Sequence, residues 1–178
     1  SSVTPTINVL NSVGGVVSGA SVAITLSITD GTGDSSAVIE GTGTVTSSNG
    51  IAVFNSAYIE KAASGYSITA TATGLTSAVS SSFSITPASP SKLAFSTHPG
   101  GAAANASLAT QPIVALQDAY GNNVTSGSSL PVTMAILSGS GTSGAVLSGT
   151  KTVNTVNGVA TFTDLKIDKV GTNYRLFT

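Results

Sequence analysis

The 178-residue chain contains no cysteine and no tryptophan, and only 7% of its residues are charged. The absence of cysteine excludes a disulfide framework and thiolate metal sites. Its six basic residues are scattered and the net charge is −1, so the sequence has no basic cluster of the kind that binds nucleic acid. It also lacks a run of about 18 apolar residues, and we therefore expect no transmembrane segment.

Serine and threonine together number 54 and glycine numbers 20, yet 40% of the residues are hydrophobic. Many hydrophobic residues alternate with polar or small ones, which is typical of strands with one face in a core and one in water. β-Branched residues in charge-poor surroundings favour strands over helices. The sequence therefore predicts an all-β protein. Two alternating runs carry the apolar sets Val22, Ile24, Leu26 and Ile28, and Leu130, Val132, Met134 and Ile136.

The sequence repeats itself at a spacing of 108 residues. The segment "TVTSSNGIAVF" from Thr44 returns as "TVNTVNGVATF" from Thr152, and the glycines before it recur as well. Upstream the spacing slips by one or two residues, where "INVLNSVGG" from Ile7 matches "IVALQDAYGN" from Ile113. Insertions and deletions collect in loops, so such a slip is consistent with a duplicated module.

Turn residues divide each copy into short segments. Asn-Gly pairs at Asn49 and Asn157 stand between apolar runs, and such pairs accept the positive φ that a two-residue hairpin needs. Short strands spaced about 8–12 residues apart are typical of a sandwich or barrel. We expect strands near 6–12, 21–29, 37–46, 50–59, 66–73 and 78–86 in the first copy, and near 92–97, 111–118, 130–137, 145–153, 158–165 and 173–178 in the second.

A short linker with two prolines, "TPASPSK" from Thr86, separates the copies. We therefore expect two antiparallel β-sandwich domains, at 1–87 and 88–178. The chain starts at Ser1 with neither a basic nor an apolar leader, so we expect a mature product or an excised piece of a longer protein.

Three segments carry short motifs: "VALQDAYGNNV" from Val114, "NTVNGVATFTDL" from Asn154 and "KVGTNYRLF" from Lys169. In these motifs the chain resembles the bacterial immunoglobulin-like (Ig-like) repeat domains of invasin- and intimin-type adhesins and other surface proteins. The first copy keeps the second and third motifs, but it has "VLNSVGGVV" without the Asp or the Asn of the first. The resemblance implies two tandem Ig-like β-sandwich domains and says little about a ligand.

Two full repeats of 108 residues are longer than this chain of 178. The segment "SKLAFSTHP" from Ser91, which the resemblance makes a first strand, has no equivalent in the first copy. The segment "AVSSSFSITP" from Ala78, a natural last strand, has no equivalent in the second. We therefore expect domain 1–87 to lack its first strand and domain 88–178 its last. Either the chain is a piece of a longer array, or strands are exchanged between molecules.

Few side chains suit catalysis or metal binding. His98 is the single histidine, no Gly-x-Ser-x-Gly motif is present, and we expect no catalytic residue and no enzyme activity. Asp30 and Asp34 share the loop "DGTGD", where two carboxylates and backbone carbonyls could hold calcium; a plain Asp-Gly turn is the alternative. We expect no other cofactor. Asp118 is interpreted as a turn-forming residue.

Tyr66 and Tyr174 occupy matching positions before a strand. A tyrosine at this place in an Ig-like domain clamps a corner by bonding to nearby backbone, and stacking on a sugar is the alternative.

We expect a structural, non-catalytic repeat module of an extracellular surface protein or filament, such as an adhesin stalk or fibre subunit. Its expected partners are neighbouring Ig-like domains or copies of itself. The alternative is a carbohydrate- or protein-binding module of a secreted adhesin. Binding loops are usually rich in aromatic residues, and here only Tyr120 lies in a predicted turn, which favours a scaffold.

Overall fold

The computed structural model describes residues 3–127 and 129–178 and divides into two compact units, Ser1–Pro87 (unit 1) and Ala88–Thr178 (unit 2). Every strand pair is antiparallel, and the described residues form no helix. The all-β class predicted from the sequence is therefore confirmed. It follows that no helix in the described part of the chain has the length and apolar character needed to cross a membrane.

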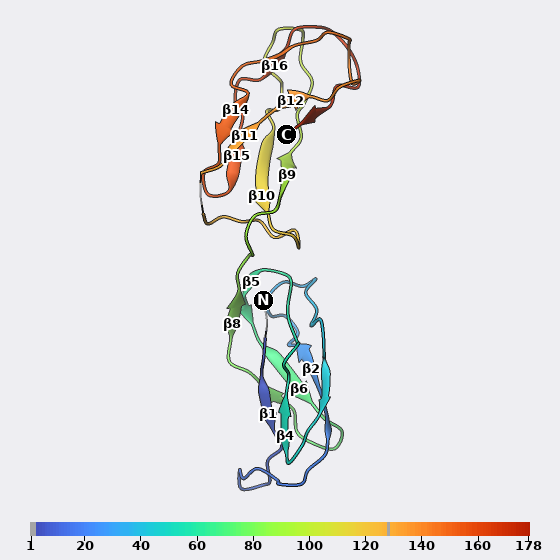
Figure 1. Ribbon diagram of the computed structural model, residues 1–178, viewed down its shortest axis with the longest axis vertical. Helices are drawn as coiled ribbons and strands as arrows, with labels where there is room; N and C mark the ends of the chain where they lie inside the picture. The colour runs from blue at the N-terminus through green and yellow to red at the C-terminus, as the bar shows by residue number, and fades with distance from the viewer. Residues whose placement is uncertain (1–2, 128) are drawn as a thin grey trace. The chain divides into compact units, whose positions relative to one another are not determined.

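Unit 1 has one four-stranded sheet and two strand pairs (Figure 1). The sheet has the order β3-β2-β6-β7, and the pairs are β1-β4 and β5-β8. The strands are β1 (Thr6–Asn8), β2 (Ala23–Ile28), β3 (Thr44–Thr46), β4 (Ile51–Val53), β5 (Ala63–Tyr66), β6 (Ile68–Thr71), β7 (Ala78–Val79) and β8 (Phe83–Ile85).

The core of unit 1 lies between the four-stranded sheet and the β1-β4 pair. Ile24 and Leu26 of β2 are buried, while Thr25 between them faces solvent, as the alternation predicts. They share one cluster with Phe54, which follows β4, and with Ile68 of β6. Side chains from both layers therefore fill one apolar interior, and their removal from water supplies the main driving force for folding.

Unit 2 has one three-stranded sheet, β15-β10-β9, and the pairs β11-β14, β12-β17 and β13-β16 (Figure 1). Its core again joins two layers, with Val114 of β10 packed in one cluster with Val132, Met134 and Phe162. The strands are β9 (Lys92–Thr97), β10 (Ile113–Gln117), β11 (Pro131–Thr133), β12 (Ala135–Ile136), β13 (Leu147–Ser148), β14 (Thr152–Asn154), β15 (Val159–Thr161), β16 (Lys166–Ile167) and β17 (Leu176–Phe177).

The units repeat their contacts at the spacing of the sequence repeat. The hydroxyl oxygens of Thr25 and Thr44 lie 2.9 Å apart in unit 1, and those of Thr133 and Thr152 lie 2.9 Å apart in unit 2. The same spacing relates the amide–hydroxyl contacts Val22–Ser47 and Leu130–Thr155, each 3.0 Å, and the left-handed residues Asn49 and Asn157. The duplication read from the sequence is therefore a duplication of structure.

Two predicted strands, at equivalent places in the two units, are shorter than expected because a glycine interrupts them. The strand expected at 145–153 divides into β13 and β14 around Gly149, whose φ of 98° is left-handed. A Cβ at Gly149 would overlap the carbonyl oxygen of Asp164, so only glycine fits this crossing. In unit 1, Gly41 has a φ of 77°, and the strand expected at 37–46 is reduced to β3 and a single bridge between Glu40 and Tyr58.

Candidate functional site

The strand β1 of unit 1 has one partner where its equivalent in unit 2 has two. Ile7 pairs with Ala52 in unit 1 as Val114 pairs with Ala160 in unit 2, which makes β1 the equivalent of β10. The strand β10 lies between β15 and β9, whereas β1 pairs with β4 alone within residues 3–127 and 129–178. One edge of β1 therefore presents backbone groups without a neighbouring strand.

The backbone groups on this edge can be identified from the ladder. The amide of Val9 donates to the carbonyl of Gly50 at 2.7 Å, and Ile7 lies opposite Ala52. In an antiparallel pair, alternate residues direct their N–H groups to the same partner. The N–H groups of Thr6 and Asn8 therefore face away from β4, toward the open edge.

Two adjoining clefts of about 450 and 420 Å³ follow this open edge, between β1 and the β6-β7 side of unit 1. Val79 of β7 lines one cleft with 60% of its surface exposed. In unit 2, β9 occupies the corresponding edge: its Phe95 lies opposite Val114 and packs on the core. The clefts of unit 1 therefore lie where a strand such as β9 lies in unit 2.

A second open position lies in unit 2. In unit 1, β5 pairs with β8, which places Phe83 opposite Tyr66 and Ile85 opposite Ala63. Residues 171–174 are the equivalent of β5 at the 108-residue spacing, and they pair with no strand in the part of the chain that the structure describes.

The open position of unit 2 goes with lower burial of its tyrosine, compared with the equivalent tyrosine of unit 1. Tyr66 is fully buried, and its ring stacks on Phe83 with centroids 5.9 Å apart, whereas Tyr174 is only half-buried. Beside Tyr174 is a cavity of about 330 Å³, which we call the β8 slot. Its walls include Leu108, Ile167, Gly171, Asn173, Tyr174 and Leu176.

Both tyrosines act as the backbone clamps that the sequence predicted. The hydroxyl of Tyr66 donates to the carbonyl of Lys61 at 2.9 Å, and the hydroxyl of Tyr174 donates to the carbonyl of Lys169 at 2.9 Å. Each ring also lies on a left-handed glycine. A Cβ at Gly33 would overlap the ring of Tyr66, and the same relation holds for Gly141 and Tyr174. This contact explains why both glycines recur in the repeat.

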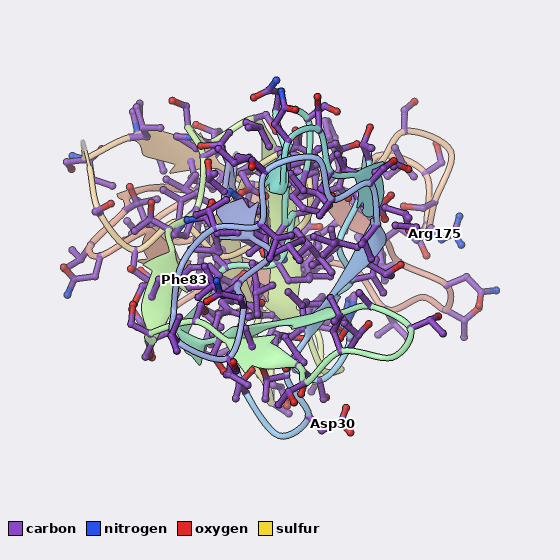
Figure 2. The ribbon with its side chains drawn as sticks, turned by 90° about the horizontal axis from the view of Figure 1, so that it is seen from below. Asp30, Phe83 and Arg175 are labelled. Atoms are coloured by element: carbon purple, nitrogen blue, oxygen red, sulfur yellow. The ribbon has the colours of Figure 1, made fainter. Side chains whose placement is uncertain are left out.

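The two predicted calcium ligands lie on one loop after β2, and within the described residues no third acidic residue joins them in a group suited to a metal ion. Asp30 is exposed, and Figure 2 shows its carboxylate pointing outward from the loop. Oδ1 of Asp34 accepts hydrogen bonds from the amide and hydroxyl of Ser36, at 2.8 and 2.6 Å. Both bonds lower the pKa of Asp34, and the bond from the Ser36 hydroxyl has the larger effect. No group of three or more acidic, histidine or cysteine residues suited to a metal ion occurs among the described residues. Calcium binding by Asp30 and Asp34 stays a prediction.

Asp118 is fully buried and organises the start of unit 2. Its Oδ1 accepts the amide N–H groups of Tyr120 and Asn122, each at 2.9 Å, which confirms its role in a turn. Its Oδ2 accepts the side-chain amide of Asn122 at 2.9 Å and the backbone N–H of Ala88 at 3.0 Å. Burial raises the pKa of Asp118, but the bonds from Asn122, Ala88 and Tyr120 outweigh burial and leave that pKa below its ordinary value.

Sequence comparison missed the equivalent of Asp118 in unit 1. The first copy was expected to lack the polar residue of this turn, yet Oδ1 of Asn11 accepts the amides of Val13 and Gly15 at 3.1 and 2.9 Å. The spacing between Asn11 and Asp118 is one residue shorter than the main repeat, so an alignment at constant spacing does not match them. Each turn has a glycine three residues later, Gly14 and Gly121, and both glycines are left-handed with φ of 86° and 85°. These glycines are the sequence feature that could have matched the two turns.

His98 is exposed, and its ring stacks on Phe95 with centroids 5.4 Å apart. The structure brings no acidic residue into hydrogen-bond contact with it among the described residues, and it places His98 beside an aromatic ring of β9 rather than in a cluster of polar groups. The expectation that the chain has no catalytic residue stays a prediction.

Comparison with known proteins adds no relative: no family model, no curated protein and no solved structure matches this chain.

Proposed function

We propose that the chain is a structural, non-catalytic repeat module of an extracellular surface protein or filament, built from two tandem Ig-like antiparallel β-sandwich domains. The observation that carries this proposal is the pair of open strand positions. Among the described residues, unit 1 has β8 but no strand on the free edge of β1, and unit 2 has β9 but no strand paired with 171–174. Each unit therefore carries the element for which the other has a vacant place.

Addition of a strand from a neighbouring module is the physical basis of the proposed assembly. An unpaired edge offers backbone donors and acceptors in a row, and an adjoining apolar cleft offers burial for alternate side chains. The free edge of β1 and its two clefts provide both features. Neighbouring modules of the same kind, in one chain or in adjacent chains, would complete each other in this way.

Association in solution tests this proposal. Sedimentation velocity of the 178-residue chain over a wide concentration range should show self-association that weakens in an Asn8→Pro variant. Proline removes an N–H that faces the open edge and leaves the pairing of Ile7 with Ala52 in place. An Asn8→Ala variant is the matched control and should associate as the unmodified chain does. A monodisperse monomer at every concentration, equal in all three proteins, would refute assembly through β1.

One feature favours the alternative, a module that binds another protein. The loop after β1 exposes apolar side chains: Val13 is 88% exposed, Leu10 is 52% exposed and Val16 is 44% exposed. Apolar side chains gathered on one loop are typical of interaction surfaces. If this loop binds a protein, adhesion of chain-coated beads to protein-coated surfaces should fall in a Val13→Ser variant whose stability is unchanged. Equal adhesion by both proteins would contradict a binding role for the loop.

A further inference from the structure

We infer that the β8 slot of unit 2 binds an extended polypeptide segment with an aromatic residue and, two positions later, a β-branched aliphatic residue, supplied by another module of the same kind. This inference rests on the proposed function, because it names the partner that would complete unit 2. In unit 1 the equivalent place is filled by β8.

Part of the wall of the β8 slot has equivalents at the filled place in unit 1, and the segment 99–106 lines the rest of the slot. Tyr66 and Ile59 of unit 1 have Tyr174 and Ile167 of unit 2 as equivalents at the 108-residue spacing. Tyr66 and Ile59 form one buried cluster with Ile85 of β8. Ile59 is completely buried there, whereas Ile167 retains 9% exposure. The same surface is therefore covered in one unit and left partly open in the other.

A third wall residue is equivalent by its backbone contact. The amide of Val3 donates to the carbonyl of Ala57 in unit 1, and the amide of Leu108 donates to the carbonyl of Leu165 in unit 2, each at 2.9 Å. Val3 packs against the cluster that contains Ile85, and Leu108 lines the β8 slot. Three residues that line the slot, Leu108, Ile167 and Tyr174, therefore have equivalents in unit 1 that belong to the cluster of Ile85 or pack against it.

The occupant in unit 1 defines the chemistry of the segment. Phe83 stacks on Tyr66, Ile85 is 5% exposed, and Ser84 between them faces solvent. This alternation is that of a strand with one face in a core. The bound segment therefore needs an aromatic residue, next a residue that can face water, and then a β-branched aliphatic residue.

The backbone of the slot is available for pairing. In unit 1, Phe83 and Ile85 lie opposite Tyr66 and Ala63 in an antiparallel ladder with an irregularity between them. The same register in unit 2 would place the aromatic residue opposite Tyr174 and the aliphatic residue opposite Gly171. Main-chain pairing would supply affinity, and the two inward side chains would supply selectivity.

The charge that lines the β8 slot does not oppose binding of such a segment. Lys169 is the one charged residue that lines the slot among the described residues, and its Nζ already lies 3.2 Å from the carbonyl oxygen of Ser143. Lys169 is exposed, so water can solvate its charge, and an uncharged segment such as 81–86, with four serine and threonine residues around Phe83 and Ile85, brings no positive charge to repel it.

The test is titration of the full 178-residue chain with a capped peptide of sequence VSSSFSITP, residues 79–87. NMR of the isotope-labelled chain should show shifts at Tyr174, Ile167 and Leu108, and nuclear Overhauser contacts between the peptide phenylalanine and the Tyr174 ring. The control peptide carries Phe83→Ser and Ile85→Ser and should bind about a hundredfold more weakly, because both buried apolar side chains are lost. A Tyr174→Phe chain keeps the ring and should bind the first peptide within about twofold.

Equal binding of both peptides, or shifts confined to other surfaces, would overturn the inference. An unmodified chain that dimerises without peptide and shows Phe83 of a second copy in contact with Tyr174 would support the inference, with a second copy as the module that supplies the segment. The outcome is separable from that of the proposed function. Loss of association in Asn8→Pro with no binding of the peptide defeats this inference alone, and peptide binding by a chain that stays monomeric defeats assembly through β1 alone.

Discussion

Removal of one hydroxyl group from each clamping tyrosine should have unequal effects on the two units. Tyr66→Phe and Tyr174→Phe delete the same hydrogen bond, of the same 2.9 Å length, to a carbonyl five residues upstream. The surroundings of these bonds differ. Tyr66 is fully buried and stacks on Phe83 of β8, and its bond to Lys61 is part-buried, so water has limited access to the carbonyl that loses its donor. Tyr174 borders the open β8 slot, and its bond to Lys169 is exposed.

The expected magnitudes follow from this difference. A buried acceptor left without a donor costs about 1–3 kcal/mol, so we expect Tyr66→Phe to lower the free energy of unfolding of unit 1 by about 2 kcal/mol. A solvated acceptor costs much less, and we expect Tyr174→Phe to lower the stability of unit 2 by less than about 0.5 kcal/mol. The ratio of the two effects depends on solvent access, because the geometry of the bonds is the same.

Native-state hydrogen exchange measures both units in one sample. The amide of Leu26 donates to Gly43 at 2.8 Å, and the amide of Met134 donates to Lys151 at 2.8 Å, so these equivalent amides report on unit 1 and unit 2. Exchange at Leu26 should accelerate by about 30-fold in Tyr66→Phe, and exchange at Met134 should change by less than about threefold in Tyr174→Phe. Equal effects in the two variants would refute the reasoning that the β8 slot is open to water.

Asp118→Asn should destabilise unit 2 by about 3 kcal/mol at neutral pH, because either orientation of the new amide sets its NH₂ group against N–H donors. The pKa of Asp118 is lowered in the folded chain, so its stabilisation is complete above the ordinary value of 3.8 and is lost as pH falls through the lower folded pKa. The difference in unfolding free energy between Asp118→Asn and the unmodified chain should therefore shrink below pH 3.8; a constant difference argues against a charged Asp118. Gly33→Ala and Gly141→Ala should each cost about 3 kcal/mol in thermal or denaturant unfolding, from positive φ and overlap with a tyrosine ring. Gly43→Ala, where a Cβ meets nothing within 4 Å, is the control, and an equal loss there would contradict this explanation.

The features that local sequence specifies were predictable. Asn49 and Gly50 have φ of 51° and 77°, as the Asn-Gly hairpin signal requires, because few other residues tolerate this geometry. The alternation around Ile24 and Leu26 gave the buried face of β2 correctly, because strand side chains alternate between faces. The clamp by Tyr66 was also predictable, since its position before a strand recurs in both copies.

Features that depend on contacts between distant segments were not predictable from the sequence. Gly149 interrupts a strand because another segment, carrying the carbonyl of Asp164, passes against it, and a single sequence does not show that contact. The role of Asn11 was hidden by a one-residue change of spacing. The sequence does predict that domain 88–178 lacks a last strand, because the segment from Ala78 has no equivalent in the second copy. The side chains that line the β8 slot depend on strand register and packing, so the structure is needed to identify them.

An electron cryo-microscopy map, at side-chain resolution, of the native assembly that contains this chain would test strand addition most directly. We expect a strand from a neighbouring module to run antiparallel to residues 171–174, with an aromatic side chain against Tyr174, and another strand to lie along the free edge of β1. Solvent or a non-peptide ligand at both positions in the assembled protein would contradict it.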